Sequence, residues 1–125
     1  MTEEVKKPKV SVLQNATNHY KRQISGAMKS FHVPEWDCEI YYRPVQTLRA
    51  EAEVVELTKS GKTVEALVMT IINKARDEEG NPLFTKHDKA SFMNEIDPQV
   101  VLRVATQING ATPEDMPALE ELEKN

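Results

Sequence analysis

The pattern of apolar and polar residues changes period once along the chain, within residues 31–44, whose sequence is FHVPEWDCEIYYRP. Apolar side chains occupy alternate positions in its two arms, namely Phe31 and Val33, then Trp36, Cys38, Ile40 and Tyr42. A period of two is typical of a half-buried β-strand. Pro34 has no amide hydrogen to donate, so its strand should lie at a sheet edge, and residues 35–37 should form the bend. The pattern therefore predicts a small β-hairpin at about residues 31–43.

On both sides of this hairpin, apolar residues recur every three or four positions, which is the period of an amphipathic helix. A first helix is predicted from Leu13 to about Phe31, where it leads directly into the hairpin. A second helix follows Pro44 and should end at the Ser60-Gly61 pair, because glycine favours the backbone conformation that stops a helix. The apolar face of the second helix consists of Val45, Leu48, Ala52 and Val55.

The strongest apolar stripe lies in residues 63–75 and consists of Val64, Leu67, Val68, Ile71, Ile72 and Ala75. This helix is the expected centre of the core, packed against the last helix and the inner face of the hairpin. The sequence DEEGNP at residues 77–82 predicts a turn, in which Gly80 and Asn81 can adopt positive φ.

Two helix-start signals follow this turn. Thr85, with Asp88 three residues later, predicts the start of a short helix. The apolar residues of that helix are Phe92 and Ile96. The Asp97-Pro98 pair then places a cap residue before a proline at the first position of the last helix, which should end at residues 109–110.

The 125 residues, 39% of them apolar and 29% charged, fit a single soluble domain with one modest core. We expect a flexible arm at residues 1–12, a helical domain with a β-hairpin at residues 13–110, and an acidic tail at residues 111–125. The predicted fold class is mainly α with a small β-hairpin, in which four to five helices surround one core.

Charge and cysteine content narrow the function classes. The net charge of −4 argues against a nucleic-acid backbone as the main partner, because that contact needs clustered lysines and arginines. A single cysteine excludes an internal disulfide, and the sequence contains neither a secretory signal nor a run of eighteen apolar residues. We therefore expect a protein of a reducing cytoplasm, with Cys38 serving as a small buried hydrophobe rather than a nucleophile.

No motif in the sequence predicts catalysis. Residues 60–63, SGKT, end like a phosphate-binding loop, but Glu56 stands where that loop needs its first glycine. The three histidines are His19, His32 and His87, and none has a second metal-binding side chain at a ligand spacing on the same predicted helix. The carboxylates Glu51, Glu53 and Glu56 are typical of a solvated helix face. We expect no enzyme activity, no cofactor and no metal site.

Several segments, taken in order, resemble one protein family. They are a basic first helix, VPEW and YYRP within residues 33–44, a two-helix stretch, DEEGNPLFT at residues 77–85, and a final helix ending in QING at residues 107–110. This combination, from about Tyr20 to Gly110, is similar to the tail assembly chaperones of long-tailed bacteriophages.

The resemblance implies a non-enzymatic role in tail morphogenesis in the host bacterial cytoplasm. Proteins of this family bind the long tape measure protein, keep it soluble until tail tube subunits polymerise round it, and are absent from the mature virion. The resemblance further implies homo-oligomers, and contact with the tail tube protein through a longer product made by translational frameshifting. An edge strand that carries exposed aromatic residues offers a physical means of self-association by strand addition.

A chaperone of helical partners needs an apolar groove or stripe and no catalytic chemistry. The candidate contact residues are Trp36, Tyr41, Tyr42 and Arg43 on or beside the hairpin, with Leu13, Tyr20, Ile24 and Met28 on the first helix. Trp36 and Tyr42 fall on the apolar face of the hairpin, so core packing is an equally good explanation for them. Tyr41 and Arg43 fall on the other face, which favours a surface role.

A small helical DNA-binding regulator is the alternative function, with the helices on either side of Ser60-Gly61 acting as a helix-turn-helix. A recognition helix should present Arg, Lys, Asn or Gln at its N-terminal end. Residues 62–69 offer Lys62 and Thr63 before they turn acidic and apolar, so the sequence favours the chaperone.

Overall fold

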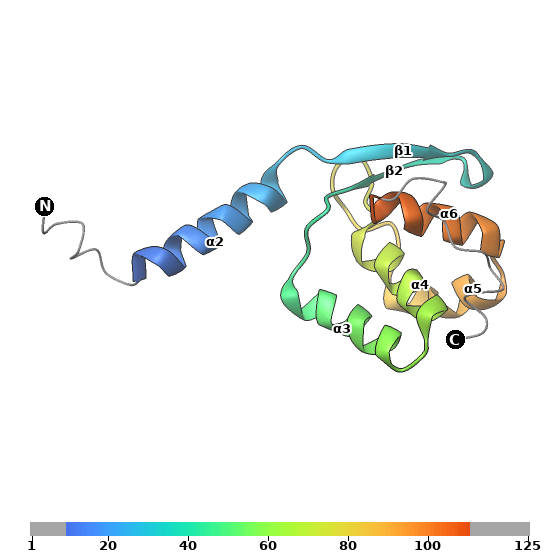
Figure 1. Ribbon diagram of the computed structural model, residues 1–125. Coiled ribbons are helices and arrows are strands. Elements are labelled where there is room, and N and C mark those ends of the chain that lie inside the picture. The colour runs from blue at the N-terminus through green and yellow to red at the C-terminus, as the bar shows by residue number, and fades with distance from the viewer. Residues whose placement is uncertain (1–9, 111–125) are drawn as a thin grey trace, which may run out of the picture.

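The computed structural model describes residues 10–110. In chain order the elements are α2 (Val10–Ser25), β1 (Lys29–Val33), β2 (Cys38–Tyr42), α3 (Leu48–Lys59), α4 (Thr63–Lys74), α5 (Lys89–Asn94) and α6 (Pro98–Ile108). The hairpin β1–β2 lies across α6, while α3, α4 and α5 lie below it and α2 extends away from this body (Figure 1). The predicted fold class, mainly α with a small β-hairpin, is confirmed.

The hairpin pairs β1 and β2 in antiparallel register, from Lys29 opposite Tyr42 to Val33 opposite Cys38. A 3-10 turn, Pro34–Trp36, joins the strands, and Asp37 closes the loop in the left-handed region at φ 51°. Aspartate is one of the few non-glycine residues that adopt this conformation readily. The bend predicted at residues 35–37 is therefore confirmed, although Pro34 belongs to the turn and not to β1.

The core lies between α4, α6 and the inner face of the hairpin, as the apolar periodicity predicts. Its most completely buried large side chains are Ile40, Ile71, Ile108, Val33, Val68 and Val104. Tyr42 is also buried, and its hydroxyl donates to the carbonyl of Gln107 at 3.2 Å. This hydrogen bond fixes the end of β2 beside the last turn of α6.

The second helix has the predicted end but a different buried face. Helix α3 stops before Ser60 and Gly61, and the Thr47 hydroxyl caps its start by accepting from the amide of Ala50 at 3.1 Å. Leu48 is 85% exposed and Val55 is 50% exposed, whereas Val54 and Leu57 pack against the core. The face predicted from Leu48 and Val55 is therefore wrong, because two overlapping apolar stripes exist on this helix and contact with α4 selects one.

The predicted start signals of the last two helices are confirmed. Thr85 and Asp88 form a reciprocal capping box. The Asp88 carboxylate accepts from the backbone amide of Thr85 at 2.8 Å, and the Thr85 hydroxyl accepts from backbone amides of the turn, including that of His87 at 3.3 Å. The carboxylate of Asp97 accepts from the amide of Gln99 at 2.9 Å, and Pro98 opens α6. Ile96 lies beyond the end of α5. In the predicted turn Gly80 takes a positive φ of 91°, whereas Asn81 does not.

The first helix differs from its prediction at both ends. Helix α2 starts at Val10, so residues 10–12 of the predicted arm are helical, and it stops at Ser25 because the chain from Lys29 onwards pairs with β2. Val12 is 69% exposed and Leu13 is 64% exposed. The remainder of the predicted arm, residues 1–9, and the predicted acidic tail, residues 111–125, lie outside the described residues.

Candidate functional site

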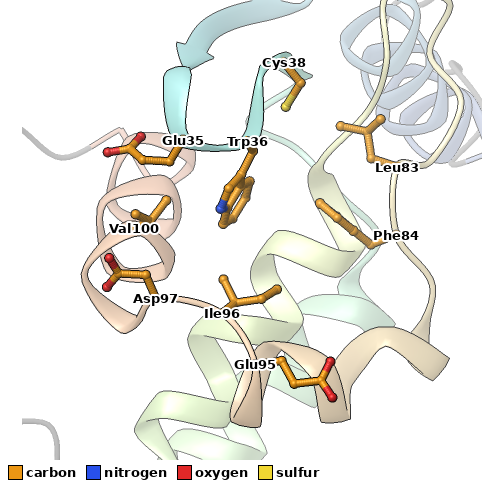
Figure 2. Close-up of a pocket in the computed structure, with 9 residues that line it drawn as sticks. All are labelled: Glu35, Trp36, Cys38, Leu83, Phe84, Glu95, Ile96, Asp97 and Val100. Carbon is orange, nitrogen blue, oxygen red and sulfur yellow. The ribbon is translucent and has the colours of Figure 1, made fainter.

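An apolar groove of about 550 Å³ opens at the closed end of the hairpin. Its floor is apolar and consists of Trp36, Leu83, Phe84, Ile96 and Val100, with Cys38 at one end. Its rim carries three carboxylates, Glu35, Glu95 and Asp97. Figure 2 shows Trp36 pointing from the hairpin tip towards Ile96, with Phe84 beside it. We call this feature the hairpin-tip groove.

The position of Trp36 follows from the tight loop that bears it. The 3-10 turn begins at Pro34, whose ring fixes φ, and the left-handed Asp37 turns the chain back into β2. The indole ring meets Phe84 edge-to-face at 6.2 Å between centroids, and Phe92 at 6.1 Å. Phe84 and Phe92 are themselves 4.9 Å apart. These three rings hold one another in place, so the wall of the groove is preformed.

The rim of the groove is ordered by polar contacts. Arg103 on α6 forms an ion pair with Glu35 and holds the pKa of that carboxyl below its ordinary value, chiefly through a hydrogen bond. Asp97 is occupied as the cap of α6. Glu95 is exposed at the junction between α5 and α6. The rim is therefore acidic, with one arginine beside it.

The lining of the groove includes one thiol, that of Cys38. Burial raises the pKa of the Cys38 thiol, and the carboxylates of Asp37 and Glu39 raise it further, so the thiol stays protonated near neutral pH. A protonated thiol is a poor nucleophile. Cys38 is half-buried at the groove and not fully buried as the sequence predicted. Among residues 10–110 no group of three or more metal-binding side chains could hold an ion.

The structure places the predicted contact residues in several separate parts of the molecule. Trp36 lines the hairpin-tip groove, whereas Tyr42 lies in the core at 8% exposure. Tyr41 is half-buried on the outer face of β2, and its backbone pairs with Arg76, with N···O distances of 2.9 and 2.7 Å.

The remaining predicted residues lie at or near α2. Tyr20, Ile24 and Arg43 line a second cavity, of about 290 Å³, where the base of α2 meets α3 and α4. Leu13 lies farther out on α2 and is exposed, while Met28 is half-buried in the connection to β1. Trp36 therefore lies at the closed end of the hairpin, whereas Tyr20, Ile24 and Arg43 meet near its open end.

Sequence reasoning did not identify the residues that line the hairpin-tip groove together with Trp36. Leu83 and Phe84 follow the 77–82 turn in an irregular segment, and Ile96 follows the end of α5. Leu83 and Phe84 belong to no periodic stripe that would place them on a face, and Ile96 is predicted on the apolar face of the short helix with Phe92, whereas α5 ends at Asn94. The adjacent apolar pair directly after a turn is the signal that could have indicated a surface cluster.

The structure argues against the helix-turn-helix alternative. Helix α4 would be the recognition helix, but its buried residues are Ala66, Val68, Met69, Thr70, Ile71, Ile72 and Lys74. A helix covered on this many positions cannot enter a major groove.

None of the helices between residues 10 and 110 is long and apolar enough to cross a bilayer.

The fold is that of a small helical domain with a β-hairpin, and the hairpin-tip groove gives it a preformed apolar surface. In sequence, the chain matches no protein-family model and no curated protein. In structure, it is similar to the tail assembly chaperone of bacteriophage HK97, with a TM-score of 0.56 and 18% identity. The match covers 74% of this chain and 95% of the HK97 chain. The two proteins share a fold, which confirms the fold that the sequence resemblance implied.

Proposed function

We propose that this protein is a non-enzymatic tail assembly chaperone of a long-tailed bacteriophage. The observation that carries the proposal is the shared fold, which extends over 95% of the HK97 tail assembly chaperone. The order of the sequence segments within residues 20–110 is a second line of support, because it is a property of the sequence and not of the fold.

The proposed mechanism is the docking of apolar helix faces of the tape measure protein in the hairpin-tip groove. A long helical protein with exposed apolar faces aggregates unless those faces are covered, and an apolar groove covers them without chemistry. Trp36 is the proposed anchor, because tryptophan is prominent among residues that dominate interface energetics. The acidic rim favours helix segments that carry lysine or arginine beside their apolar residues.

The proposal includes the partners and place of action that the family resemblance implies. The protein would work in the host bacterial cytoplasm and would leave before the virion is complete. A longer, frameshift-extended form would bring in the tail tube protein. Self-association would use β1, which within the described residues pairs with β2 alone and so presents an open edge.

Co-expression with the tape measure protein encoded nearest to this chain tests the proposal. We expect this chain to raise the soluble fraction of the tape measure protein and to co-elute with it. The variant Trp36→Ala should weaken the complex by about 2 kcal/mol or more, roughly thirtyfold in affinity, because it removes the proposed anchor. Glu95→Lys should also weaken binding to basic segments, and it alters an exposed rim residue.

Leu48→Ala provides the matched control, since Leu48 is 85% exposed on α3 and lies outside the groove. Its complex should elute like that of the unchanged protein, and circular dichroism should show that all three variants fold. A tape measure protein that stays insoluble beside a well-folded partner would refute the chaperone role. Solubilisation that neither groove variant affects would instead place the contact on another surface.

A further inference from the structure

The second cavity, where the base of α2 meets the body, has an unusual excess of positive charge. Arg43, Lys74 and Arg76 all line its volume of about 290 Å³. Lys74 is 9% exposed, and both arginines are half-buried. The one carboxylate within 4 Å of these cations among the described residues is Glu51, whose Oε2 is 3.8 Å from Lys74 Nζ. We call this cavity the α2-base site.

The cations at this site are held in place but retain unused donors. Arg43 Nε donates to the carbonyl of Gly26 at 2.8 Å, and Arg76 Nη2 donates to the carbonyl of Asn73 at 3.2 Å. Lys74 Nζ donates to the carbonyl of Pro44 at 3.3 Å. A guanidinium has five N–H groups, and among residues 10–110 each of these arginine side chains donates one of them, which leaves the others for a further acceptor.

One buried donor at the same site lacks a partner. Asn73 Nδ2 is buried and has no hydrogen-bond partner among the described residues, and a carboxylate could accept from it. Gln46 Oε1 is also buried without a partner among those residues, but it is itself an acceptor, so it needs a water between it and a carboxylate. Buried polar atoms without partners cost free energy, and they are rare in folded proteins. Asp77 in the nearby turn has a carboxylate that already accepts a hydrogen bond, from the amide of Asn81 at 2.9 Å. Glu78 and Glu79 in the same turn are exposed.

We propose that the α2-base site binds a carboxylate side chain from the acidic segment at residues 111–125 of the same chain. The inference concerns a site distinct from the hairpin-tip groove and does not depend on the proposed function. The volume suits one carboxylate side chain with a few water molecules, since a water's share of liquid volume is about 30 Å³. Guanidinium N–H groups form stronger hydrogen bonds with a carboxylate than with a neutral acceptor, so the two arginines favour a carboxylate.

The charge and the starting point of that segment make it the occupant. It carries Glu114, Asp115, Glu120, Glu121 and Glu123 against the single cation Lys124. It leaves the described fold at Gly110, three residues after Gln107, whose carbonyl is fixed to the Tyr42 hydroxyl next to Arg43. An extended chain covers about 3.3 Å per residue, so its carboxylates can reach roughly 13 to 43 Å from Gly110.

Occupancy of this site would act on α2. Tyr20 and Ile24, from the last two turns of α2, line the same cavity as the three cations. A carboxylate bound there would lie between the helix and the body. The acidic segment would therefore help to fix the direction in which α2 leaves the body.

Carbodiimide cross-linking of the full chain tests this inference, because the reagent joins an amine directly to a carboxylate that it contacts. The Lys74–Glu51 pair is 3.8 Å apart and supplies an internal reference cross-link. We expect a second product that joins Lys74 to a carboxylate within residues 111–125. Mixing isotope-labelled and unlabelled chains should show that this product forms within one chain.

Two variants of the full chain sharpen the test. Arg76→Gln and Arg43→Gln should each lower the yield of the cross-link to residues 111–125 several-fold, relative to the Lys74–Glu51 reference. Lys59→Gln is the matched control, since Lys59 is exposed at the far end of α3 and should change nothing. Lys74 cross-linked to Glu51 alone would overturn the proposal. It would equally be overturned by products that join labelled to unlabelled chains, or by yields that neither arginine variant lowers.

Discussion

Single residues set the geometry of the hairpin-tip groove. Asp37 turns the chain at φ 51° and thereby aims Trp36, and Asp97 both caps α6 and contributes to the rim. Glu35 and Arg103 join the hairpin loop to α6 by an ion pair between residues far apart in the sequence. The groove therefore depends on a few polar contacts as well as on its apolar floor.

The Glu35–Arg103 pair predicts a pH-dependent contribution to stability. The pKa of Glu35 lies below its ordinary value in the folded protein, so the carboxylate favours the folded state while it is ionised. This contribution is present above the unfolded pKa, about 4.3 for glutamate, and is lost as the pH falls through the lower folded value. Arg103→Gln should therefore unfold at a lower temperature than the unchanged protein at pH 7. The difference should begin to shrink as the pH falls through about 4.3 and should disappear once the pH is below the lowered pKa of the folded carboxyl.

Thermal unfolding of both proteins across a pH series gives the measurement. The difference between the two unfolding temperatures removes the effect of the other groups that protonate in acid, because both proteins contain those groups. Lys59→Gln, which removes an exposed positive charge elsewhere, should follow the unchanged protein at every pH. A difference between Arg103→Gln and the unchanged protein that persists undiminished in acid would mean that Arg103 acts through packing.

At the scale of elements, two helices with similar apolar periodicity differ in how much of their surface is buried. Helix α4 is buried on most of its surface, and its Ile71 is fully buried. Helix α3 packs through Val54 and Leu57 and leaves Leu48 in solvent. The burial of a position, and not its hydrophobicity, decides what a substitution there will do.

Ile71→Asp should abolish folding. An uncompensated carboxylate in this core costs several kcal/mol, which is comparable to the total of about 5–15 kcal/mol that stabilises a small domain. Leu48→Asp makes the same kind of change in solvent and should leave the fold intact, as should Tyr41→Ala on the outer face of the hairpin. Circular dichroism and urea unfolding measure the result. A native helical spectrum for Ile71→Asp would disprove the assignment of α4 as the core helix.

At the scale of the whole molecule, α2 stands apart from a body that spans β1 to α6 (Figure 1). Its outer part exposes Val12 and Leu13, and its base contacts the body near Tyr20 and Ile24. Isolated helices of about this length are marginally stable in water. The stability of the molecule is therefore unevenly distributed.

Hydrogen exchange should reveal this unevenness. In dilute solution, amides in the outer half of α2 should exchange rapidly, while amides of α4 and α6 should exchange only through global unfolding. Mass spectrometry of peptides from each helix measures the rates. If the amides of α2 exchanged as slowly as those of α4 in a monomer, another part of the chain would have to cover α2.

Much of the local structure could be predicted because its causes lie within a few residues. The Thr85–Asp88 box, the Asp97-Pro98 start and the positive φ of Gly80 each depend on a single turn of chain. The hairpin follows from alternation and from a proline at its bend. The shared phage-chaperone fold was likewise anticipated from segments in order along the chain.

The sequence by itself therefore determined which segments are helices and strands, the starts that a local cap marks, and which helix is most apolar. Tertiary structure decided which face of α3 is buried, that α2 lies outside the body, and that Trp36 meets Phe84 and Ile96 in one groove. It also gathered Arg43, Lys74 and Arg76 into one cavity. The physical reason is range: hydrogen bonds, caps and periodicity act between neighbours in sequence, whereas the partner of a face is chosen by packing between distant segments.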